Sequence, residues 1–430
     1  MNILVIGTGY VGTTTALVFA ELGWNVTGLD SNAAKIEQLR QGHLPIYEPG
    51  LEELLRKHLQ SGRIRFTTDK AQAFRANEVI FISVGTPSQP DGSADLRFVK
   101  QVAEDIGQGM NGYKLVVIKS TVPVGTQEQV TAWIQAAQQE DHPFDVASNP
   151  EFLREGKALT DALNPDRVII GSTSSRAIEH LQTLYQSLSC PLVVTSPRTA
   201  ELIKYASNAY LATKISYMNE LAKLCDQLGV NVKEVANGIG LDHRIGPSFL
   251  HAGIGYGGSC FPKDVAALLR IAQENAVELG VLKQVEYVNQ TQHLYMLGKA
   301  RECLGTLADG TIALLGLAFK PDTDDIREAP AIRLIQSLLS EHAIIRLHDP
   351  VAKLPESLMH ESVTVCPTPE DALKGADAVF LCTEWTQYRQ LDWVRMKSLM
   401  NQPNLFDGRN LLDADHMKFI GYSYRGIGYE

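Results

Sequence analysis

The sequence contains little cysteine, and the cysteines that it has are scattered. Only six occur in 430 residues, at positions 190, 225, 260, 303, 366 and 382, and no two of them form a CxxC pair. This spacing argues against a zinc knuckle and against a disulfide scaffold. We therefore expect no metal site and a protein of a reducing compartment.

Long apolar runs and an excess of basic residues are absent too. No apolar stretch approaches the ~20 residues that span a bilayer, and the apolar run at residues 2–7 has no basic region before it and no cleavage site after it. Lys and Arg number 39 against 49 Asp and Glu, a formal net charge of -10, whereas nucleic acid favours a concentrated basic surface. We expect a cytoplasmic protein of two or three domains that binds neither membranes nor nucleic acid.

Apolar runs alternate with helical periodicity near both ends of the chain. Residues 3–6 predict a strand, 11–22 a helix and 24–30 a second strand, and further strands are predicted at 79–84, 114–119 and 168–171. Long amphipathic helices are predicted at 200–228 and 262–304. At residue 311 the first pattern restarts, with strands at 312–315, 343–349 and 379–383, a helix at 331–339 and an irregular tail from residue 410. The fold class is therefore α/β, with two Rossmann-like doubly wound parallel-sheet domains joined by a long central helical segment.

The first predicted strand ends in a dinucleotide fingerprint. The segment GTGYVG matches GxGxxG through Gly7, Gly9 and Gly12, opens a helix and is followed by Asp30 at the end of the next strand. Asp30 would accept hydrogen bonds from ribose hydroxyls and repel a 2′-phosphate, which predicts NAD as the cofactor. Lys35, in the next helix, is either a second ribose contact or a solvated surface lysine.

One cysteine lies between a glycine-rich loop and a predicted helix start. In GYGGSCFPKD (255–264), Pro262 suits the first turn of a helix, so Cys260 lies near the positive end of the helix dipole, with Lys263 close by. Both effects favour the nucleophilic thiolate, although most lone cysteines are small buried hydrophobes. A nicotinamide site together with a nucleophilic thiol predicts an alcohol oxidised to an acid in two hydride steps, through a thiohemiacetal and a thioester.

Two polar pairs are spaced as on a helix. Lys204 and Asn208 would share one helix face, where they could stabilise an oxyanion or position a water. Glu151 and Glu155, interpreted as one turn apart, are candidate general bases. Solvated helix faces are the alternative for both pairs. Hydroxyl residues in the loops at 84–87 and 120–125 either contact a cofactor or catalytic water or cap their own turns.

Six segments spread over nearly the whole chain carry a family resemblance: YEPGL at 47–51, NPEFLREG at 149–156, residues 253–264, GLAFK at 316–320, TEW at 383–385 and DGRN at 407–410. Through them the chain resembles the sugar-nucleotide 6-dehydrogenases of the UDP-glucose/GDP-mannose dehydrogenase family. The resemblance implies an NAD-dependent, four-electron oxidation of UDP-glucose to UDP-glucuronate, with Cys260 as the nucleophile that carries the thioester.

The resemblance also implies residue roles. Lys204, Asn208 and Asp264 would handle the oxyanions and the water, and Thr121 and Glu151 would assist proton transfer. NAD contacts would come from Gly7, Gly9, Tyr10, Val11, Gly12, Asp30, Lys35, Thr86, Thr121, Glu155, Lys263 and Arg327. Substrate contacts would come from Phe152, Leu153, Arg154, Glu155, Lys204, Asn208, Phe249, Leu250, His251, Ala252, Gly253, Gly257, Phe319, Lys320 and Arg409, with Arg244 reaching the substrate of the neighbouring subunit.

Three domains follow from the resemblance: an NAD-binding Rossmann-like domain at residues 1–198, a central helical dimerisation domain with the cysteine loop at 199–305, and a UDP-sugar-binding Rossmann-like domain at 306–430. A homodimer built on the central helices is implied, with further association left open. The turn at 316–319 lacks GxGxxG, so we expect no second dinucleotide there, and Lys320 and Arg409 are candidate charge partners for a diphosphate.

Several alternatives stay open. The nearest is the same chemistry on GDP-mannose or UDP-N-acetylmannosamine, although Ser259 resembles the glucose enzymes, because the N-acetylmannosamine enzymes tend to carry histidine before the cysteine. A two-electron 3-hydroxyacid dehydrogenase would leave the Cys260 loop without a purpose. A non-catalytic NAD-binding sensor would not need a candidate residue at every chemical position.

Overall fold

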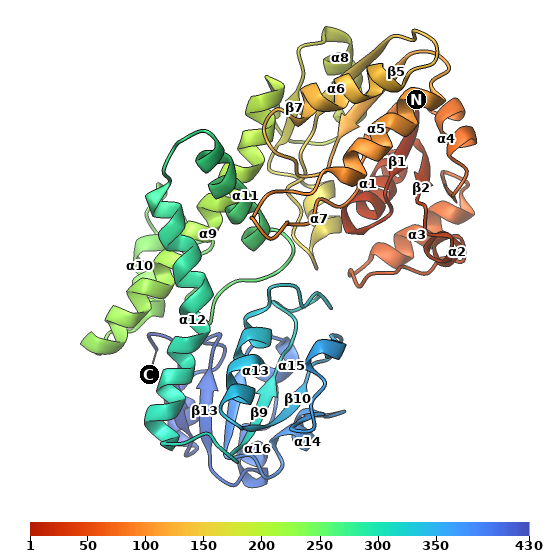
Figure 1. Cartoon of the computed structure of the whole chain (residues 1–430). Coiled ribbons are helices and arrows are strands. Elements are labelled where there is room, and N and C mark those ends of the chain that lie inside the picture. The colour runs from red at the N-terminus through yellow and green to blue at the C-terminus, as the bar shows by residue number, and fades with distance from the viewer. Residues whose placement is uncertain (430) are drawn as a thin grey trace. The chain divides into compact units, whose positions relative to one another are not determined.

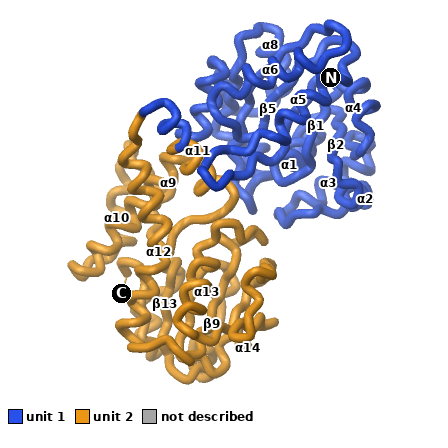
Figure 2. Tube along the Cα trace, viewed as in Figure 1, with its two compact units in different colours: residues 1–207, 270–276 blue, residues 208–269, 277–430 orange. Residues whose placement is uncertain are grey.

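Buried strands build two separate sheets, and the computed structural model describes residues 1–429 around them (Figure 1). The chain divides into two units (Figure 2). The first comprises residues 1–207 and 270–276, and the second comprises residues 208–269 and the chain from 277. Within the described residues, none of the helices combines the length and the apolar character that crossing a membrane requires.

The first unit is built around an eight-stranded sheet of order β3-β2-β1-β4-β5-β6-β7-β8. The strands are parallel from β3 to β6, whereas β7 pairs antiparallel with β6 and parallel with β8. Its elements are β1 (Asn2–Ile6), α1 (Tyr10–Glu21), β2 (Asn25–Leu29), α2 (Ala33–Arg40), α3 (Leu51–Gln60), β3 (Ile64–Thr67), α4 (Lys70–Ala76), β4 (Val79–Ile82), α5 (Arg97–Gly109), β5 (Lys114–Ile118), α6 (Thr126–Ala137), β6 (Phe144–Ser148), α7 (Ala158–Leu163), β7 (Val168–Gly171), α8 (Ser175–Tyr185), β8 (Leu192–Thr195) and the start of α9 (Pro197–Leu228).

The second unit is built around a six-stranded parallel sheet of order β11-β10-β9-β12-β13-β14. Its elements are the rest of α9, α10 (Val232–Gly240), most of α11 (Phe261–Glu274), α12 (Gly280–Leu304), β9 (Thr311–Leu315), α13 (Pro330–Ser340), β10 (Ile344–His348), η1 (Glu356–Leu358), β11 (Val363–Val365), α14 (Pro369–Leu373), β12 (Ala378–Leu381), α15 (Thr386–Arg389), α16 (Trp393–Leu399), β13 (Asn404–Asp407), α17 (Ala414–Phe419) and β14 (Ser423–Arg425).

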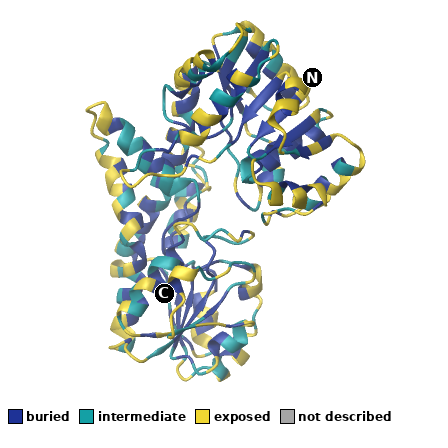
Figure 3. Ribbon diagram, turned by 45° about the vertical axis from the view of Figure 1, so that its right-hand side comes forward, coloured by how far each residue is buried: buried dark blue, intermediate teal, exposed yellow. Residues whose placement is uncertain are grey.

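Both sheets bury their central strands on two faces, as the apolar runs predict (Figure 3). In β1, Ile3 and Val5 pack into one core cluster and Leu4 and Ile6 into another. Strand β9 divides its side chains between two clusters in the same alternating way. Six strands of each sheet also follow one order, which confirms that the second Rossmann-like fold repeats the first.

Two predictions about the later helices were wrong. The single helix expected over 262–304 is two helices, α11 and α12, because Ala276 adopts a left-handed φ of 55° and Leu279 takes up a non-helical conformation ahead of α12. The tail from residue 410 is not irregular, since it contains α17, capped by Asp413, and the edge strand β14. Elements as short as α17 and β14 contain too few residues for apolar periodicity to reveal them.

Helix α9 is tied to the start of α6 by a buried carboxylate. Glu201 accepts hydrogen bonds from the backbone N–H of Gly125 at 2.7 Å and of Gln127 at 2.9 Å, and from the Ser148 hydroxyl at 3.3 Å. Burial outweighs these hydrogen bonds and raises the pKa of Glu201 to about 7. The carboxyl therefore serves as the N-terminal cap that α6 lacks in its own sequence.

This raised pKa predicts a pH-dependent stability. Between pH 4.5 and about 7 the folded protein holds a proton on Glu201, whereas the unfolded chain has released it. The contribution of Glu201 to the free energy of unfolding is therefore fully present below pH 4.5 and is lost as the pH rises through 7. Relative to Glu201→Gln, the free energy of unfolding of the wild type should fall by up to about 3 kcal/mol across this window, measured by urea unfolding. Glu128→Gln, at an exposed neighbouring carboxylate, is the control; because this variant keeps Glu201, its stability should fall with pH as that of the wild type does.

Candidate functional site

The turn after β1 is shaped by its glycines. Gly7 has a left-handed φ of 90°, and a Cβ on Gly12 would lie 1.8 Å from the Gly7 carbonyl oxygen, so α1 can start against the turn only without a side chain there. A Cβ on Gly9 would meet no atom within 4 Å. The backbone at Gly9 therefore borders open space at the N-terminus of α1, where a pyrophosphate could approach.

Asp30 lies directly after β2, beside this turn. Its carboxylate accepts hydrogen bonds from the Thr8 backbone N–H and hydroxyl, both at 2.9 Å, and from the Asn32 N–H at 3.0 Å. The Lys35 ammonium is 3.0 Å away. Although burial opposes ionisation, these hydrogen bonds lower the pKa of Asp30 and keep it a carboxylate.

The loops after β4 and β5 are tied to each other. The Thr86 hydroxyl donates to the Thr121 carbonyl at 2.8 Å, and the Ser120 hydroxyl donates to the Val84 carbonyl at 2.6 Å. Since β2, β1, β4 and β5 are neighbours in the sheet, these loops and the glycine turn follow the carboxyl ends of adjacent parallel strands.

These residues fit a dinucleotide. They provide an open backbone approach at Gly9, the N-terminus of α1 for an anion, and an ionised Asp30 for ribose hydroxyls. The described residues 1–429 contain no group of three or more His, Cys, Asp or Glu side chains that could hold a metal ion.

A buried ion pair lies at the end of β6. Glu151 is 5% exposed, Lys204 of α9 is 3% exposed, and the Lys204 ammonium donates to the Glu151 carboxylate at 3.0 Å. The Glu151 carboxylate also accepts from the Leu153 N–H at 2.5 Å. The prediction that Glu151 and Glu155 are a helical turn apart was wrong, because residues 149–157 form no helix and Glu151 bonds to the backbone of its own loop.

The rest of this loop is held by a carboxylate that sequence reasoning left without a role. Glu48 of the YEPGL segment accepts from the backbone N–H of Gly156 at 2.6 Å and of Ala158 at 2.7 Å, and from the Tyr10 hydroxyl. Burial, followed by the hydrogen bond to Glu48, raises the pKa of Tyr10, so the phenol stays protonated. Tyr10, predicted to contact NAD, is thereby joined to the segment that contains Glu155.

In the second unit the cysteine lies where the helix start was predicted. Helix α11 begins at Phe261, and the Asp264 N–H donates to the Cys260 carbonyl at 2.9 Å, which places Cys260 at the N-terminal cap position. The thiol is partly exposed, in no disulfide, and 3.6 Å from the Ser259 hydroxyl. Cys260 thus lies at the positive end of a helix.

Polar side chains follow the cysteine on the same helix. The Asp264 carboxylate is 1% exposed and accepts from the Asn208 amide at 2.6 Å and from the Lys263 ammonium. Lys204 and Asn208 both belong to α9, as predicted, and the division between the two units falls between them.

The glycine loop before Cys260 packs against two other loops of this unit. A Cβ on Gly257 would lie 2.5 Å from the Glu328 carbonyl oxygen, and a Cβ on Gly258 would lie 2.7 Å from the Phe319 ring. The Arg409 guanidinium donates to the carbonyls of Gly255 at 2.8 Å and Phe319 at 3.1 Å. Arg409 therefore braces the cysteine loop against the end of β9.

The other residues predicted to contact the substrate differ in burial. The side chains of Leu250 and Ala252 lie in a hydrophobic core, so only their backbone can face a ligand, whereas His251 is exposed. Phe249 packs against Phe261, with ring centroids 6.0 Å apart.

Other predicted residues form local pairs: Arg154 with Asp161, Arg327 with Asp325, Phe152 under Arg167, and Lys320 over Phe319. The Arg244 guanidinium pairs with Asp242, and its side chain is 79% exposed.

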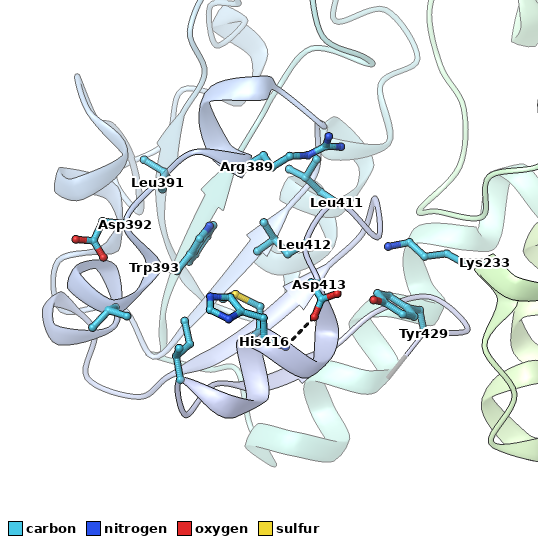
Figure 4. Close-up of a pocket in the computed structure, with 13 residues that line it drawn as sticks. Lys233, Arg389, Leu391, Asp392, Trp393, Leu411, Leu412, Asp413, His416 and Tyr429 are labelled. Atoms are coloured by element: carbon cyan, nitrogen blue, oxygen red, sulfur yellow. Dashed lines mark hydrogen bonds between the residues drawn. The ribbon is translucent and has the colours of Figure 1, made fainter.

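A cavity of about 570 Å³ in the second unit contains none of the predicted residues (Figure 4). The Lys233 ammonium lies 3.9 Å from the centroid of the Tyr429 ring at its border, and Asp413 accepts from the His416 N–H at 2.7 Å. Its acidic and basic side chains are mixed, so the lining has no charge preference and we assign it no ligand.

Known proteins match this chain over its whole length. Models of the UDP-glucose/GDP-mannose dehydrogenase family match its NAD binding domain at residues 1–189, its central domain at 198–291 and its UDP binding domain at 313–414. A UDP-glucose 6-dehydrogenase of Pseudomonas aeruginosa is 46% identical, with 100% of this chain and 97% of that protein covered.

Solved structures agree with this match. A UDP-glucose dehydrogenase of Pyrobaculum islandicum is 41% identical with a TM-score of 0.93, over 100% of this chain and 98% of that one. A UDP-D-ManNAc dehydrogenase of Pyrococcus horikoshii is 30% identical with a TM-score of 0.88, over 100% and 99%.

The first site yields a test. Asp30→Ala removes the carboxylate expected to hold the ribose, so NAD should bind about 10- to 100-fold more weakly in calorimetric titration, while the affinity for UDP-sugar stays unchanged. Asp69→Ala, which removes the exposed N-terminal cap of α4, is the control and should bind NAD normally. Equal loss of both ligands in Asp30→Ala would mean that the glycine turn is not the cofactor site.

Proposed function

Because the chain belongs to the UDP-glucose/GDP-mannose dehydrogenase family and is an NAD-dependent oxidoreductase, we propose that it oxidises UDP-glucose to UDP-glucuronate. The oxidation removes four electrons and turns the sugar C6 alcohol into a carboxylate. NAD⁺, which the glycine turn and Asp30 would hold, would supply a hydride acceptor for each of the two oxidation steps, so two NAD⁺ would be consumed per sugar.

The observation that carries the proposal is Cys260 at the N-terminal cap of α11. After the alcohol has become an aldehyde, the Cys260 thiolate adds to the carbonyl carbon and forms a thiohemiacetal. Loss of the second hydride leaves a thioester, and attack by water releases the carboxylic acid and restores the thiol. The helix N-terminus favours the thiolate that this addition needs.

Five further polar residues would handle charge and protons. Lys204, Asn208 and Asp264 would stabilise the oxyanions of the two tetrahedral species and position the water. Thr121 and Glu151 would assist proton transfer. The Glu151–Lys204 and Asn208–Asp264 contacts support these roles, since each pre-positions a polar group in a buried place.

The second Rossmann-like fold would bind the UDP part of the substrate. We propose the division into residues 1–198 for NAD, 199–305 for the helical centre with the cysteine loop, and 306–430 for the UDP-sugar. Lys320 and Arg409 remain the proposed partners of the diphosphate. Because Arg409 also donates to three carbonyls, its role there would include holding the loop in shape.

The same chemistry on another sugar nucleotide is the second candidate, supported by the likeness to the UDP-D-ManNAc dehydrogenase. The test is the number of NADH molecules formed per sugar nucleotide consumed by the purified protein. We expect two per UDP-glucose and little turnover of GDP-mannose or UDP-N-acetylmannosamine. One NADH per sugar would mean that the aldehyde escapes, and turnover of another nucleotide would move the specificity while keeping the chemistry.

In the same assay, Cys260→Ser should abolish steady-state turnover and leave NAD binding intact, because a serine hydroxyl is not ionised at neutral pH. Cys303→Ser, at an exposed cysteine of the same unit, is the matched control and should turn over normally. Undiminished turnover in Cys260→Ser would remove the covalent mechanism.

We also propose a homodimer built on α9. Tyr210, Tyr217, Leu224 and Leu228 are 65%, 56%, 52% and 65% exposed in the single chain. Their spacing of seven, seven and four residues places them along one face of the helix. An apolar stripe of this length favours burial against a second copy, and exposed Arg244 is free of the core to reach across.

Tyr217→Lys should split this dimer, because it places a charge in the middle of the stripe. Light scattering after size exclusion should give a dimer for the wild type and a monomer for the variant. Phe419→Lys, at an 87% exposed aromatic outside α9, is the matched control and should remain dimeric. A wild-type monomer, or a dimeric Tyr217→Lys, would contradict the proposal.

A further inference from the structure

The Glu151 carboxylate has a second lysine in its surroundings besides Lys204. Lys119 directly follows β5, the strand that pairs with β6, and Glu151 lies three residues beyond β6. The Lys119 ammonium is hydrogen-bonded to the side chain of Asn149, which is two residues before Glu151. The Glu151 loop therefore has two ammonium groups against it, that of buried Lys204 and that of partly buried Lys119.

Lys119 is held in place by its own contacts. Its ammonium donates to the side-chain oxygen of Asn149 at 3.0 Å, and that oxygen also accepts from the Tyr185 hydroxyl at 2.6 Å. The Asn149 amide in turn donates to the Ile169 carbonyl at 2.7 Å. Because Asn149 is two residues before Glu151, this chain of hydrogen bonds fixes both the lysine and the start of the Glu151 loop.

We propose that Lys119 is a positioning residue of the reaction, a second positive charge anchored on Asn149 next to the Glu151–Lys204 pair. The inference rests on the proposed function, in which Glu151 assists proton transfer. An isolated carboxylate this deeply buried would favour its neutral form, and one lysine shared with it gives a neutral pair. The second lysine makes the cluster net positive, which suits a place where oxyanions develop.

The titration of the cluster agrees with this geometry. Burial opposes the ionisation of Glu151, but Lys204, the Leu153 N–H and Lys119 together lower its pKa. Burial lowers the pKa of Lys119 to about 8, with Glu151 opposing and Lys204 adding to the shift. Burial also raises the pKa of Tyr185, the other titratable group against Lys119, so its phenol stays neutral.

The experiment compares three variants in the full-length enzyme. Lys119→Gln removes the charge and keeps a hydrogen-bonding amide, and Lys119→Arg keeps the charge. Lys114→Met is the matched control, because Lys114 is a buried lysine at the opposite end of β5 whose ammonium binds the carbonyls of Phe74 and Asn77, both at 2.7 Å.

The readout is kcat against pH with both substrates saturating. In Lys119→Gln the acid limb should lie at least about one pH unit higher than in the wild type, because Glu151 protonates more easily without the second charge. It should stay in place in Lys119→Arg and Lys114→Met, and KM for NAD should not change. A Lys119→Gln profile that matches Lys114→Met, with Glu151→Gln impaired, would overturn the inference and leave the proposed function standing.

A stability cycle tests the charge interaction without turnover. Urea unfolding at pH 7 gives the free energy of unfolding of Lys119→Gln, Glu151→Gln and the double variant. The double variant should lose less of this free energy than the sum of the losses in the two single variants. Additive losses would overturn the inference. Full turnover by Glu151→Gln would instead remove the role of Glu151 from the proposed function, and with it any role of Lys119 in the reaction.

Discussion

Parallel strand pairing is the constraint on which the candidate cofactor site of this protein depends. Parallel neighbours need crossover connections, so every loop that follows a strand leaves the sheet at the same edge. In the first unit, the glycine turn after β1, Asp30 after β2 and the hydrogen-bonded loops after β4 and β5 therefore lie at the same edge of the sheet. Residues separated by more than a hundred positions in the sequence thus contribute to one edge of one sheet.

Buried carboxylates fasten the loops at that edge. Glu48 caps the backbone of the segment after residue 155, Glu201 caps α6, and Glu151 bonds to the backbone of its own loop. Each gives up hydration and gains two or more charge-assisted or backbone hydrogen bonds, which are costly to lose inside the protein. Loops held in this way can present catalytic groups in one geometry.

The sequence predicted the architecture well because long periodic segments dominate it. The α9 helix, the central strands and the glycine turn follow from periodicity and from the fingerprint, and the helix start after Cys260 follows from Pro262. Glu151 and Glu155 were misplaced on a helix because spacing alone cannot distinguish a helical turn from a loop. Lys119 and Glu201 were missed, since nothing in a single sequence distinguishes a partly buried lysine or a buried glutamate from a solvated one.

The two Rossmann-like repeats differ in how each uses the acid after its second strand. Asp349, after β10, accepts from the backbone N–H groups of Leu317, Ala318, Val351 and Ala352 and from the Trp385 indole. The four backbone donors are fixed in the fold, and they alone match the roughly four acceptor positions that a carboxylate has.

Asp30 is also fully hydrogen-bonded, but two of its donors, the Thr8 hydroxyl and the Lys35 ammonium, are on rotatable groups. A ribose hydroxyl can replace a rotatable donor without breaking the turn, whereas at Asp349 it would have to displace the backbone. The same acid in the same topological place therefore has exchangeable donors in the first repeat and mainly backbone donors in the second. The turn after β9, which lacks GxGxxG, is thus the turn whose acid is bonded to fixed backbone donors.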